Sequence, residues 1–481
     1  MRIAEFSAEL LYKQKGEDQS ADFFYKAVEI PLCMKSLTVT VTTHSSSYAQ
    51  IPFALFSPDS EIRILKTSEG GSGDYSASCT IGERASDRGG LSGPIGSGTW
   101  RLILQKRRFS EDILADVVIE GDPVAASSEP FVQKTDDKAA PRAGAGWYRG
   151  ELHVHSDHST GRDTIPDIIR VAEKAGLDFI AITDHFTISH WEEERALADS
   201  PVLIIQSMEL SGNRGHANLH GIRTMKNPYV DDDGTLASFF GVDKLPDMSD
   251  VADSVHSESG LFCINHPDSN IASAWRYHEF PVRKADLIEV WCTSEGGFSM
   301  RYPAIWDQYL MQGIHLTGVC SSDSHKAEDH PFWSLGRIMT HVYADELSEK
   351  GIIDGLRRGN AFMAKGDSLL DFHASDSGHT VNMGESVMDL ENAVFHVRLM
   401  NHPAGNLFIY LTGQLHDIVR FSEDDEDYAF SVSPGCVGSG ECQYIRLEFY
   451  DELASPRFWG DTPRSQDALR LMSNPIYFSK E

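Results

Sequence analysis

Two histidines, His153 and His155, lie two positions apart in the segment GELHVHSDHS and could together bind a metal ion. The apolar residues around them are typical of a strand, and in a strand residues i and i+2 point to the same face. Two imidazoles on one face of a strand end can chelate zinc, manganese or iron. The pair alone is weak evidence, because two exposed histidines, or two with ordinary hydrogen-bond partners, would give the same pattern.

More side chains of metal-ligand type directly follow predicted strands. They are Asp184 and His185 after FIAIT, Glu209 at the end of VLIIQSME, His266 after LFCIN, and Asp323 with His325 after HLTGVCSS. Since α/β folds build their sites just past the strands, these groups would share one site. A carboxylate such as Glu209 can bridge two cations held about 3.5–4 Å apart. We therefore expect a site for divalent metal ions, rather than a set of structural histidines and helix caps.

Several of these motifs resemble those of a known family. LHVHS, AITDH, NHP and SSDSH look like the motifs of the polymerase-and-histidinol-phosphatase (PHP) superfamily. The phrases GELHVH, AGLDFIAITDH, GHANLHG, DLIEVW, DGLRRGNAF and SNPIYF resemble more closely its CehA/McbA-like metallohydrolase branch. The resemblance is nearly continuous over residues 150–366 and weaker outside them. It implies a distorted (β/α)7 barrel with two to three divalent ions, Mn, Zn or Fe, at the carboxyl ends of the strands.

The resemblance also implies how two metal ions share their ligands. The first ion would be held by His153, His155, Glu209 and Asp323. Glu209 would bridge to a second ion, completed by His266 and by a histidine of GHANLHG. His216 matches the family's GHxN phrase and is the preferred ligand, while His220 on the same strand face is the alternative.

A third ion would be held by His185 and His325, and here the sequence departs from the family. The family usually carries an acidic residue or a histidine shortly after the HxH pair, whereas Thr160 occupies that position here. His158 and Asp163 lie nearby but two or three residues out of register. The sequence therefore leaves the third site open and keeps the binuclear core.

Metal ions in this arrangement imply hydrolysis. A hydroxide bridging the first two ions would be the nucleophile, and the ions would polarise a phosphoryl or carbonyl oxygen. Asp268, two residues after His266, is a candidate proton donor to the leaving group, or simply a turn residue. Asp184 is the second candidate catalytic carboxylate, although it fits better as a residue that orients a ligand.

Other residues could contact the substrate. Arg301, Lys365 and Arg162 could bind a phosphate through charge-assisted hydrogen bonds, or could form ordinary surface salt bridges. Trp275 and Trp291 could form a wall of the pocket or could belong to the core. Convergent cations would indicate a phosphate substrate, whereas an apolar slot would indicate an aryl carbamate.

Three functions are compatible with these residues. The leading hypothesis is a metal-dependent phosphoesterase acting on a small phosphoester or nucleotide, because this is the commonest chemistry of the superfamily. The first alternative is hydrolysis of a carbamate, ester or amide bond, since the CehA name belongs to a carbaryl-hydrolysing branch. The second is a non-catalytic protein that binds a sugar or polymer, which the intact ligand set argues against.

The middle region carries the elements that must position these residues. Thr164 can cap a helix with Pro166 and Asp167 in its first turn, and the helix DIIRVAEKAG would end at Gly176. The strand LDFIAITDH follows it. Similar alternation recurs in ADLIEVWCT, MRYPAIWDQYLMQG and HLTGVCSSDSH, which favours a parallel sheet or barrel.

Shorter strands separated by turns flank this region on both sides. AVEIPL, SLTVTVTTH and TWRLILQK precede it, and NAVFHVRLMN, NLFIYLTG and YIRLEFYD follow it. We therefore predict an α/β fold with three domains: a β-sandwich-like domain over 1–145, a metallohydrolase barrel over 146–366 and a C-terminal β-rich module over 367–481.

The bulk composition narrows the choice of partners and compartment. A net charge of −30 disfavours nucleic acid and anionic membranes, so exonuclease-like processing is not expected and a small-molecule substrate is. The chain has no run of about 18 apolar residues and no secretory signal at its start. Its seven cysteines form no CxxC pair, which indicates free thiols. We expect a cytoplasmic protein, and the sequence leaves its oligomeric state open.

Overall fold

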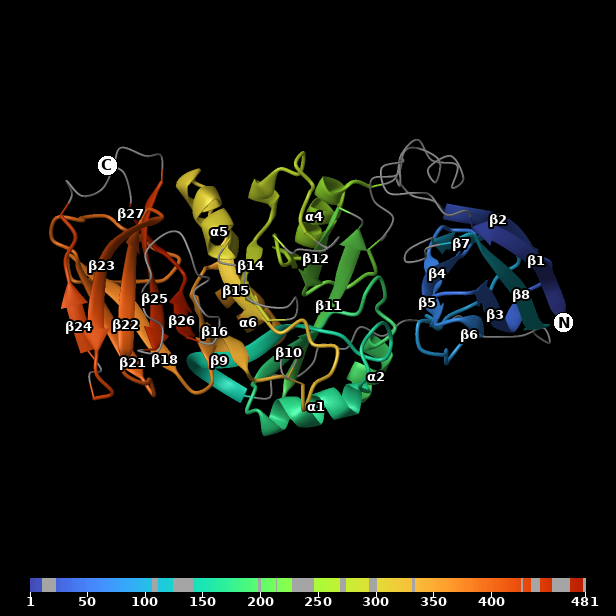
Figure 1. Cartoon of the computed structure of the whole chain (residues 1–481), viewed down its shortest axis with the longest axis horizontal. Coiled ribbons are helices and arrows are strands. Elements are labelled where there is room, and N and C mark those ends of the chain that lie inside the picture. The colour runs from blue at the N-terminus through green and yellow to red at the C-terminus, as the bar shows by residue number, and fades with distance from the viewer. Residues whose placement is uncertain are drawn as a thin grey trace.

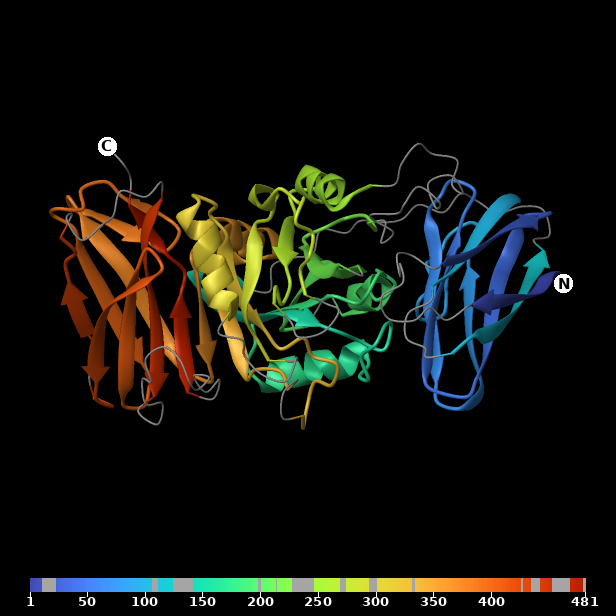
Figure 2. The same cartoon turned by 45° about the horizontal axis from the view of Figure 1, so that its top comes forward.

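The computed structural model has three regions that follow one another along the long axis of the molecule (Figure 1, Figure 2). Strands form both ends, and most of the helices lie in the middle region. The residues described are 1–10, 23–105, 111–123, 142–197, 200–212, 214–226, 246–268, 274–293, 301–330, 334–424, 427–433, 442–451 and 468–478.

The N-terminal region consists of two antiparallel sheets packed over one core. Its strands are β1 (Arg2–Leu10), β2 (Phe23–Ile30), β3 (Met34–Ser45), β4 (Ala49–Phe56), β5 (Ile62–Gly70), β6 (Gly73–Gly82), β7 (Gly98–Gln105) and β8 (Ile113–Pro123). They pair in the orders β1-β8-β3-β6 and β2-β7-β4-β5. Alternate residues are buried, so that Val39 and Val117 from one sheet share the core with Phe53 and Leu102 from the other.

Seven strands of the middle region form a ring that carries the candidate residues. They are β9 (Arg142–Val154), β10 (Phe179–Ile182), β11 (Leu203–Gly212), β12 (Gly215–His220), β13 (Leu261–Ile264), β14 (Leu287–Cys292) and β15 (Thr317–Ser321), and they neighbour one another in chain order. The segment after β15 returns to β9, where the Ser324 N–H donates to the His153 carbonyl at 3.2 Å and the His155 N–H donates to the Ser324 carbonyl at 2.8 Å. The ring therefore closes beside the HxH pair.

Helices connect most of these strands. They are α1 (Ile165–Lys174), α2 (Trp191–Ala196), α4 (Met248–Ser257), the 3-10 helix η1 (Val282–Lys284) and α5 (Arg301–Met311), with α6 (Glu349–Arg357) beyond the ring. The predicted start of α1 is confirmed, because the Thr164 side chain accepts from the Asp167 N–H. The alternation is incomplete, since β12 is antiparallel to β11 and β13 and joins β11 as a hairpin.

The C-terminal strands extend the sheet of the middle region. They are β16 (Ile338–Leu347), β17 (Ala361–Lys365), β18 (Leu369–Asp376), β19 (His379–Asn382), β20 (Ser386–Val387), β21 (Val394–Met400), β22 (Gly405–Leu411), β23 (Gln414–Phe421), β24 (Asp427–Phe430), β25 (Gln443–Asp451), β26 (Leu469–Ser473) and β27 (Ile476–Phe478). The sheet runs on from β9 through β16-β17-β26-β25-β22-β23. A second sheet, β19-β18-β21-β24, packs on it through residues such as Phe372 and Leu447.

A buried ion pair ties α5 to the C-terminal sheet. Arg446 on β25 donates to both carboxylate oxygens of Asp307 on α5, at 2.8 and 2.6 Å, and to Glu448 at 2.6 Å. The Asp307 carboxylate also accepts from the Tyr444 hydroxyl at 2.6 Å. Since these charges are buried and hydrogen-bonded to one another, the middle and C-terminal regions are joined by polar contacts as well as by a shared sheet.

The predicted domain boundary at residue 145 falls inside β9, and the one at 366 falls between β17 and β18. Within the described ranges, no helix is long and apolar enough to cross a lipid bilayer. Six of the seven cysteines are described and all six are free, whereas Cys436 lies outside the described residues.

Candidate metal centre

Glu209, at the end of β11, is fully buried and lies among five histidine side chains. Its oxygen Oε1 faces His216 Nδ1 at 3.1 Å, His153 Nε2 at 3.4 Å and His266 Nε2 at 3.8 Å. Its oxygen Oε2 faces His185 Nδ1 at 2.5 Å and His155 Nε2 at 3.6 Å. The two oxygens thus face two different sets of imidazoles, which is the arrangement of a carboxylate able to bridge two cations.

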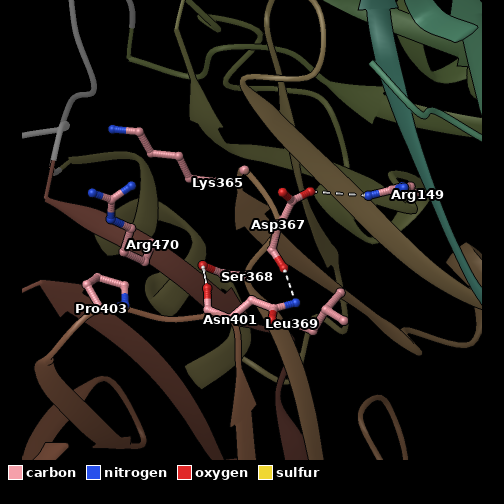
Figure 3. A pocket seen from close by; sticks show the side chains of 9 residues that line it. Arg149, Lys365, Asp367, Ser368, Leu369, Asn401, Pro403 and Arg470 are labelled. Atoms are coloured by element: carbon pink, nitrogen blue, oxygen red, sulfur yellow. Dashed lines mark hydrogen bonds and ion pairs between the residues drawn. The ribbon is translucent and has the colours of Figure 1, made fainter. Parts of the chain in front are cut away.

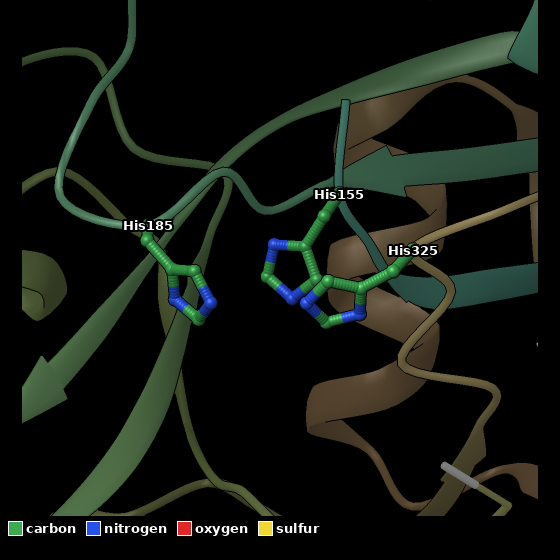
Figure 4. A group of neighbouring side chains, drawn as sticks. All are labelled: His155, His185 and His325. Carbon is green, nitrogen blue, oxygen red and sulfur yellow. The ribbon is translucent and has the colours of Figure 1, made fainter. Parts of the chain in front are cut away.

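Asp323 completes this group from the end of β15. Its Oδ1 lies 3.0 Å from His155 Nε2, 3.3 Å from His153 Nε2 and 3.7 Å from His325 Nδ1. Figure 4 shows His155 with His185 and His325 beside it. The ring centroid of His155 is 4.3 Å from that of His185 and 4.4 Å from that of His325, so His155 lies between the two.

Several buried nitrogens of this cluster suit metal coordination. Among the described residues, His153 Nε2, His155 Nδ1 and His266 Nδ1 are buried and have no hydrogen-bond partner. A buried polar atom without a partner is costly, and a cation would satisfy it. In the part of the chain that the structure describes, side chains with ligand atoms within 4.8 Å of one another form four sets: His155, His185 and His325; His153, His155 and Glu209; His153, His266 and Glu289; Glu209, His216 and His266. The donor chemistry therefore fits divalent metal ions.

Burial and the neighbouring charges shift the pKa values of the cluster in different directions. Burial, with His325 next to it, lowers the pKa of His155 to about 4, so that its imidazole is neutral as a metal ligand must be. Burial would also lower the pKa of His153, but Asp323 and the neighbouring carboxylates raise that pKa well above its usual range. Burial would raise the pKa of Glu209, but His185 and the other imidazoles hold it well below its usual range.

The backbone is strained at residues of the site. His266 has φ +24° and Asp323 has φ +48°, and Phe186, directly after His185, has φ +58°. Non-glycine residues rarely adopt positive φ, at a cost of order 1–3 kcal/mol each. The surrounding hydrogen bonds keep these conformations, including the bond from the Phe186 N–H to the Glu209 carbonyl at 2.8 Å. His266 and Asp323 belong to the cluster, whereas the Phe186 side chain packs in the hydrophobic core beside it.

Glu289 on β14 belongs to the candidate site, and the sequence reasoning missed it. It accepts from His153 Nδ1 at 2.8 Å, from the His266 N–H at 2.7 Å and from the Ser321 hydroxyl at 2.5 Å. Because Nδ1 of His153 is held by Glu289, its Nε2 points to Glu209 and Asp323. The available signal was a carboxylate within DLIEVW, a strand that is otherwise apolar and fully buried.

The structure distinguishes the two histidines of β12. His216 contacts Glu209, whereas His220 lies deeper in the ring, where its Nδ1 is 3.0 Å from the Ser207 hydroxyl oxygen. Burial lowers the pKa of His220 to about 3. Their positions agree with His216 as the ligand and His220 as a neutral core residue.

Asp184 lies next to the cluster and holds the loop that follows the HxH pair. It accepts from the Ser156 N–H at 2.8 Å, from the Ser156 hydroxyl and from the Ser159 hydroxyl at 2.5 Å. It is absent from the four ligand sets, and burial raises its pKa to about 7. Asp184 therefore shapes the loop rather than contributing a ligand atom.

The same loop contains the residues considered for the missing third-site ligand. Thr160 Oγ1 is buried and has no hydrogen-bond partner among the described residues. His158 is turned toward Ser189 and Glu193, at 2.8 and 3.2 Å. Asp163 accepts from the Ala327 N–H at 2.6 Å. None of the three belongs to a ligand set within the described ranges.

The N-terminal region contacts the loops beside the cluster. Arg88 forms an ion pair with Asp157, two residues after His155, and lies 3.6 Å from Glu193. The Gly89 N–H donates to the Ser189 hydroxyl at 3.1 Å. Apolar residues of both regions share one core. The N-terminal sheets therefore support the loop between the HxH pair and α1.

The residues proposed from the sequence to contact the substrate do not all lie at the cluster. Arg301 Nε lies 3.0 Å from a carboxylate oxygen of Asp268, which is two residues after His266. The Arg301 side chain is largely exposed. Lys365 is not brought to the cluster: it lines a separate cavity with Arg149, because β17 pairs with β26 there. The Arg162 N–H donates to the His325 carbonyl at 3.0 Å. Trp291 is buried in the core, whereas Trp275 packs against Gly215 beside His216.

One protein-family model matches part of the chain. The model of the PHP domain matches residues 151–227. No curated protein matches the chain. Together with the histidine and carboxylate cluster, the PHP match supports a metal-dependent hydrolase.

Solved structures resemble the chain only distantly. A two-domain protein from Bacteroides vulgatus, described as containing a predicted PHP-like metal-dependent phosphoesterase, is 16% identical with a TM-score of 0.37 and covers 72% of this chain and 100% of its own. PsfC from Pseudomonas syringae is 15% identical with a TM-score of 0.32, and the match covers 46% of this chain and 92% of PsfC. An amidohydrolase from Chromobacterium violaceum is 16% identical with a TM-score of 0.27, and the match covers 38% of this chain and 93% of the amidohydrolase. At these TM-scores the likenesses carry no conclusion about activity.

Proposed function

We propose that the protein is a phosphoesterase of the PHP superfamily that uses two divalent ions, Mn, Zn or Fe, to hydrolyse a small phosphoester or nucleotide. The observation that carries this proposal is Glu209, whose two oxygens face two separate sets of imidazoles. The ring of seven strands is consistent with a distorted (β/α)7 barrel of the CehA/McbA-like branch. A third ion at His185 and His325, with His155 between them, is the variable part of the proposal.

The side chains have distinct roles in this mechanism. When bound, the ions supply a Lewis acid and lower the pKa of a water molecule. Glu289 holds His153 by its Nδ1 and so keeps Nε2 directed at the ions. Neutral His155 can coordinate without first losing a proton. The chain thus provides a preorganised set of ligands before any substrate binds.

Arg301 is the residue that supports a phosphate substrate. Its guanidinium is largely exposed and paired with Asp268, in the segment that follows His266. A guanidinium in this position can bind phosphoryl oxygens by charge-assisted hydrogen bonds. Asp268, considered from the sequence as a proton donor, is placed to orient Arg301.

A carbamate, ester or amide hydrolase is the second candidate. Trp275 supports it, because this aromatic residue packs on Gly215, the residue before His216, and forms an apolar group with Tyr277 and Phe280. An aryl substrate needs an apolar wall of this kind. The position of Lys365 away from the cluster also removes one of the cations that a phosphate would use.

The test combines elemental analysis with turnover of p-nitrophenyl phosphate and p-nitrophenyl acetate, before and after chelation. About two or more metal ions per chain with chelator-sensitive phosphate release are expected. The Glu209→Gln and Asp323→Asn variants should lose activity and bound metal together. Glu258→Gln is the matched control, because this largely buried glutamate pairs with Lys226 at the other end of β13.

Each alternative predicts a different result. Chelator-sensitive ester cleavage without phosphate release would favour the second candidate. Stoichiometric metal with neither activity would indicate a substrate outside both classes. Absence of metal, or full activity of the Glu209→Gln variant, would contradict the metal centre itself.

A further inference from the structure

Arg88, between β6 and β7 of the N-terminal region, contacts two segments that each follow a candidate metal ligand. Its guanidinium forms an ion pair with Asp157, two residues after His155. Its Nε lies 3.6 Å from Glu193 Oε1 on α2, the helix that follows His185 in the chain. Both histidines belong to one set of candidate ligands. One N-terminal side chain therefore bridges the segments that follow two members of that set.

The contacts around Arg88 form a closed circuit of polar groups. Glu193 Oε1 lies 3.2 Å from His158 Nε2, and His158 Nδ1 lies 2.8 Å from the Ser189 hydroxyl oxygen. The Ser189 hydroxyl accepts from the N–H of Gly89, the residue after Arg88, at 3.1 Å. Because the circuit passes twice through the N-terminal region, the loop that carries His158 and the segment that carries Ser189 cannot separate without breaking it.

The N-terminal sheets hold Arg88 in place. Its carbonyl accepts from Lys66 Nζ at 3.0 Å, and the Gly89 carbonyl accepts from the Leu65 N–H at 2.7 Å. Gly89 has φ +89°, and a Cβ at this position would lie 2.5 Å from the Leu65 carbonyl oxygen. Leu65 also shares a hydrophobic core with Phe186, the first residue of the second segment. Arg88 thus extends from a part of the N-terminal region that is packed against the middle region.

Asp157 depends on Arg88 for its charge balance. Its Oδ2 pairs with Arg88, and Arg88 is the one cation that the described residues place against it. Its Oδ1 is buried and has no hydrogen-bond partner within the described ranges. A buried carboxylate that loses its cation is costly, so the loop would rearrange to bring Asp157 to water. That loop begins directly after His155.

We propose that Arg88 is a positioning residue of the metal centre, which holds the loop after His155 against the segment after His185. In this arrangement the two imidazole centroids are 4.3 Å apart, beside His325. Metal–nitrogen distances of about 2.0–2.1 Å leave little tolerance for a shift of either ring. The inference rests on the proposed metal centre and gives the N-terminal region a role in binding the ion that these three histidines would share.

The test is metal retention by the full chain over a series of chelator concentrations, with turnover of p-nitrophenyl phosphate measured on the same samples. Arg88→Gln is expected to weaken retention of the most weakly held ion about fivefold, since the ion pair is partly exposed. Arg88→Lys keeps a cation beside Asp157 and should recover part of this loss. Arg470→Gln is the matched control, because it removes an arginine–aspartate pair at the cavity shown in Figure 3, in the C-terminal region.

An exchange of charges separates positioning from a general loss of stability. Arg88→Asp and Asp157→Arg should each weaken metal retention, whereas the double variant restores opposite charges and should recover it. Circular dichroism checks that each variant is folded. Wild-type retention in folded Arg88→Gln, an equal loss in Arg470→Gln, or a double variant no better than the single ones would overturn the proposal.

The same samples distinguish this inference from the proposed function. Failure of the phosphoesterase proposal would appear in the wild type, as retained metal without phosphate release. Failure of the role of Arg88 would appear only in the variants, as retention equal to that of the wild type. A wild type that holds no metal would overturn both.

Discussion

Replacement of Glu289 by glutamine tests whether the hydrogen bond between this carboxylate and His153 affects the affinity of the candidate site for metal ions. The three donors around this carboxylate are His153 Nδ1 and the Ser321 hydroxyl on Oε1, and the His266 N–H on Oε2. Glutamine offers one oxygen and one NH2 group. Whichever way the amide is turned, its NH2 faces a donor, so at least one of these hydrogen bonds is lost.

The size of the effect follows from that lost contact. A buried hydrogen bond to a charged acceptor contributes about 1.5–3 kcal/mol. Loss of a residue that orients a histidine ligand typically weakens metal binding about 10- to 100-fold, or about 1.4–2.7 kcal/mol. We therefore expect Glu289→Gln to fold and to bind metal at least tenfold more weakly than the wild type.

The assay is metal retention during dialysis against a series of chelator concentrations, read by elemental analysis. Glu258→Gln undergoes the same chemical change and should keep the affinity of the wild type. Circular dichroism of the metal-free proteins checks that both variants are folded. If folded Glu289→Gln retains metal as the wild type does, then Glu289 does not orient His153, and our account of the site is wrong.

Three further changes have defined outcomes. Asp163→Asn should leave metal content unchanged, because Asp163 holds the Ala327 N–H and no imidazole, and a loss of metal seen by elemental analysis would assign it to the third site. Asp286 raises the pKa of His256 in the folded protein. The pair therefore stabilises the fold at pH values below the histidine pKa in the unfolded chain, about 6.5, and this effect is lost as the pH rises through the pKa of His256 in the folded protein. Accordingly, His256→Gln should lower the free energy of unfolding, measured by urea denaturation, by about 0.5 kcal/mol at pH 5.5 and leave it unchanged at pH 9, and an equal loss at both pH values would exclude the ion pair as the cause. Arg446→Met should cost about 3–5 kcal/mol in urea denaturation, since it leaves Asp307 buried without its cation, and a loss below 1 kcal/mol would mean that water reaches Asp307.

The sequence predicted the groups that follow strands because local patterns determine where a strand ends. Apolar runs such as FIAIT and LFCIN end at Asp184 and His266, and both residues lie at or beside the cluster. The cap of α1 was equally accessible, since Thr164 and Asp167 are three residues apart. In each case the decisive contact lies within a few residues of the chain.

Glu289 and Lys365 depended on contacts that the local sequence does not contain. Glu289 meets His153 across 136 residues, and the strand around it gives no sign of which face its carboxylate takes. Lys365 is the last residue of an ordinary strand, β17, and its position is determined by pairing with β26, which begins at Leu469. The antiparallel direction of β12 likewise depends on its pairing with β11, which the local sequence does not contain.

The pairing of β17 with β26 also has a consequence for how the chain acquires its structure. During synthesis, β17 leaves the ribosome more than a hundred residues before β26, so the edge that includes Phe362 and Ala364 stays open until the last strands are made. An open edge with apolar side chains is a template for pairing with other chains. A chain cut after residue 366 would keep every residue of the metal cluster and still be prone to aggregate, because nothing would cover that edge.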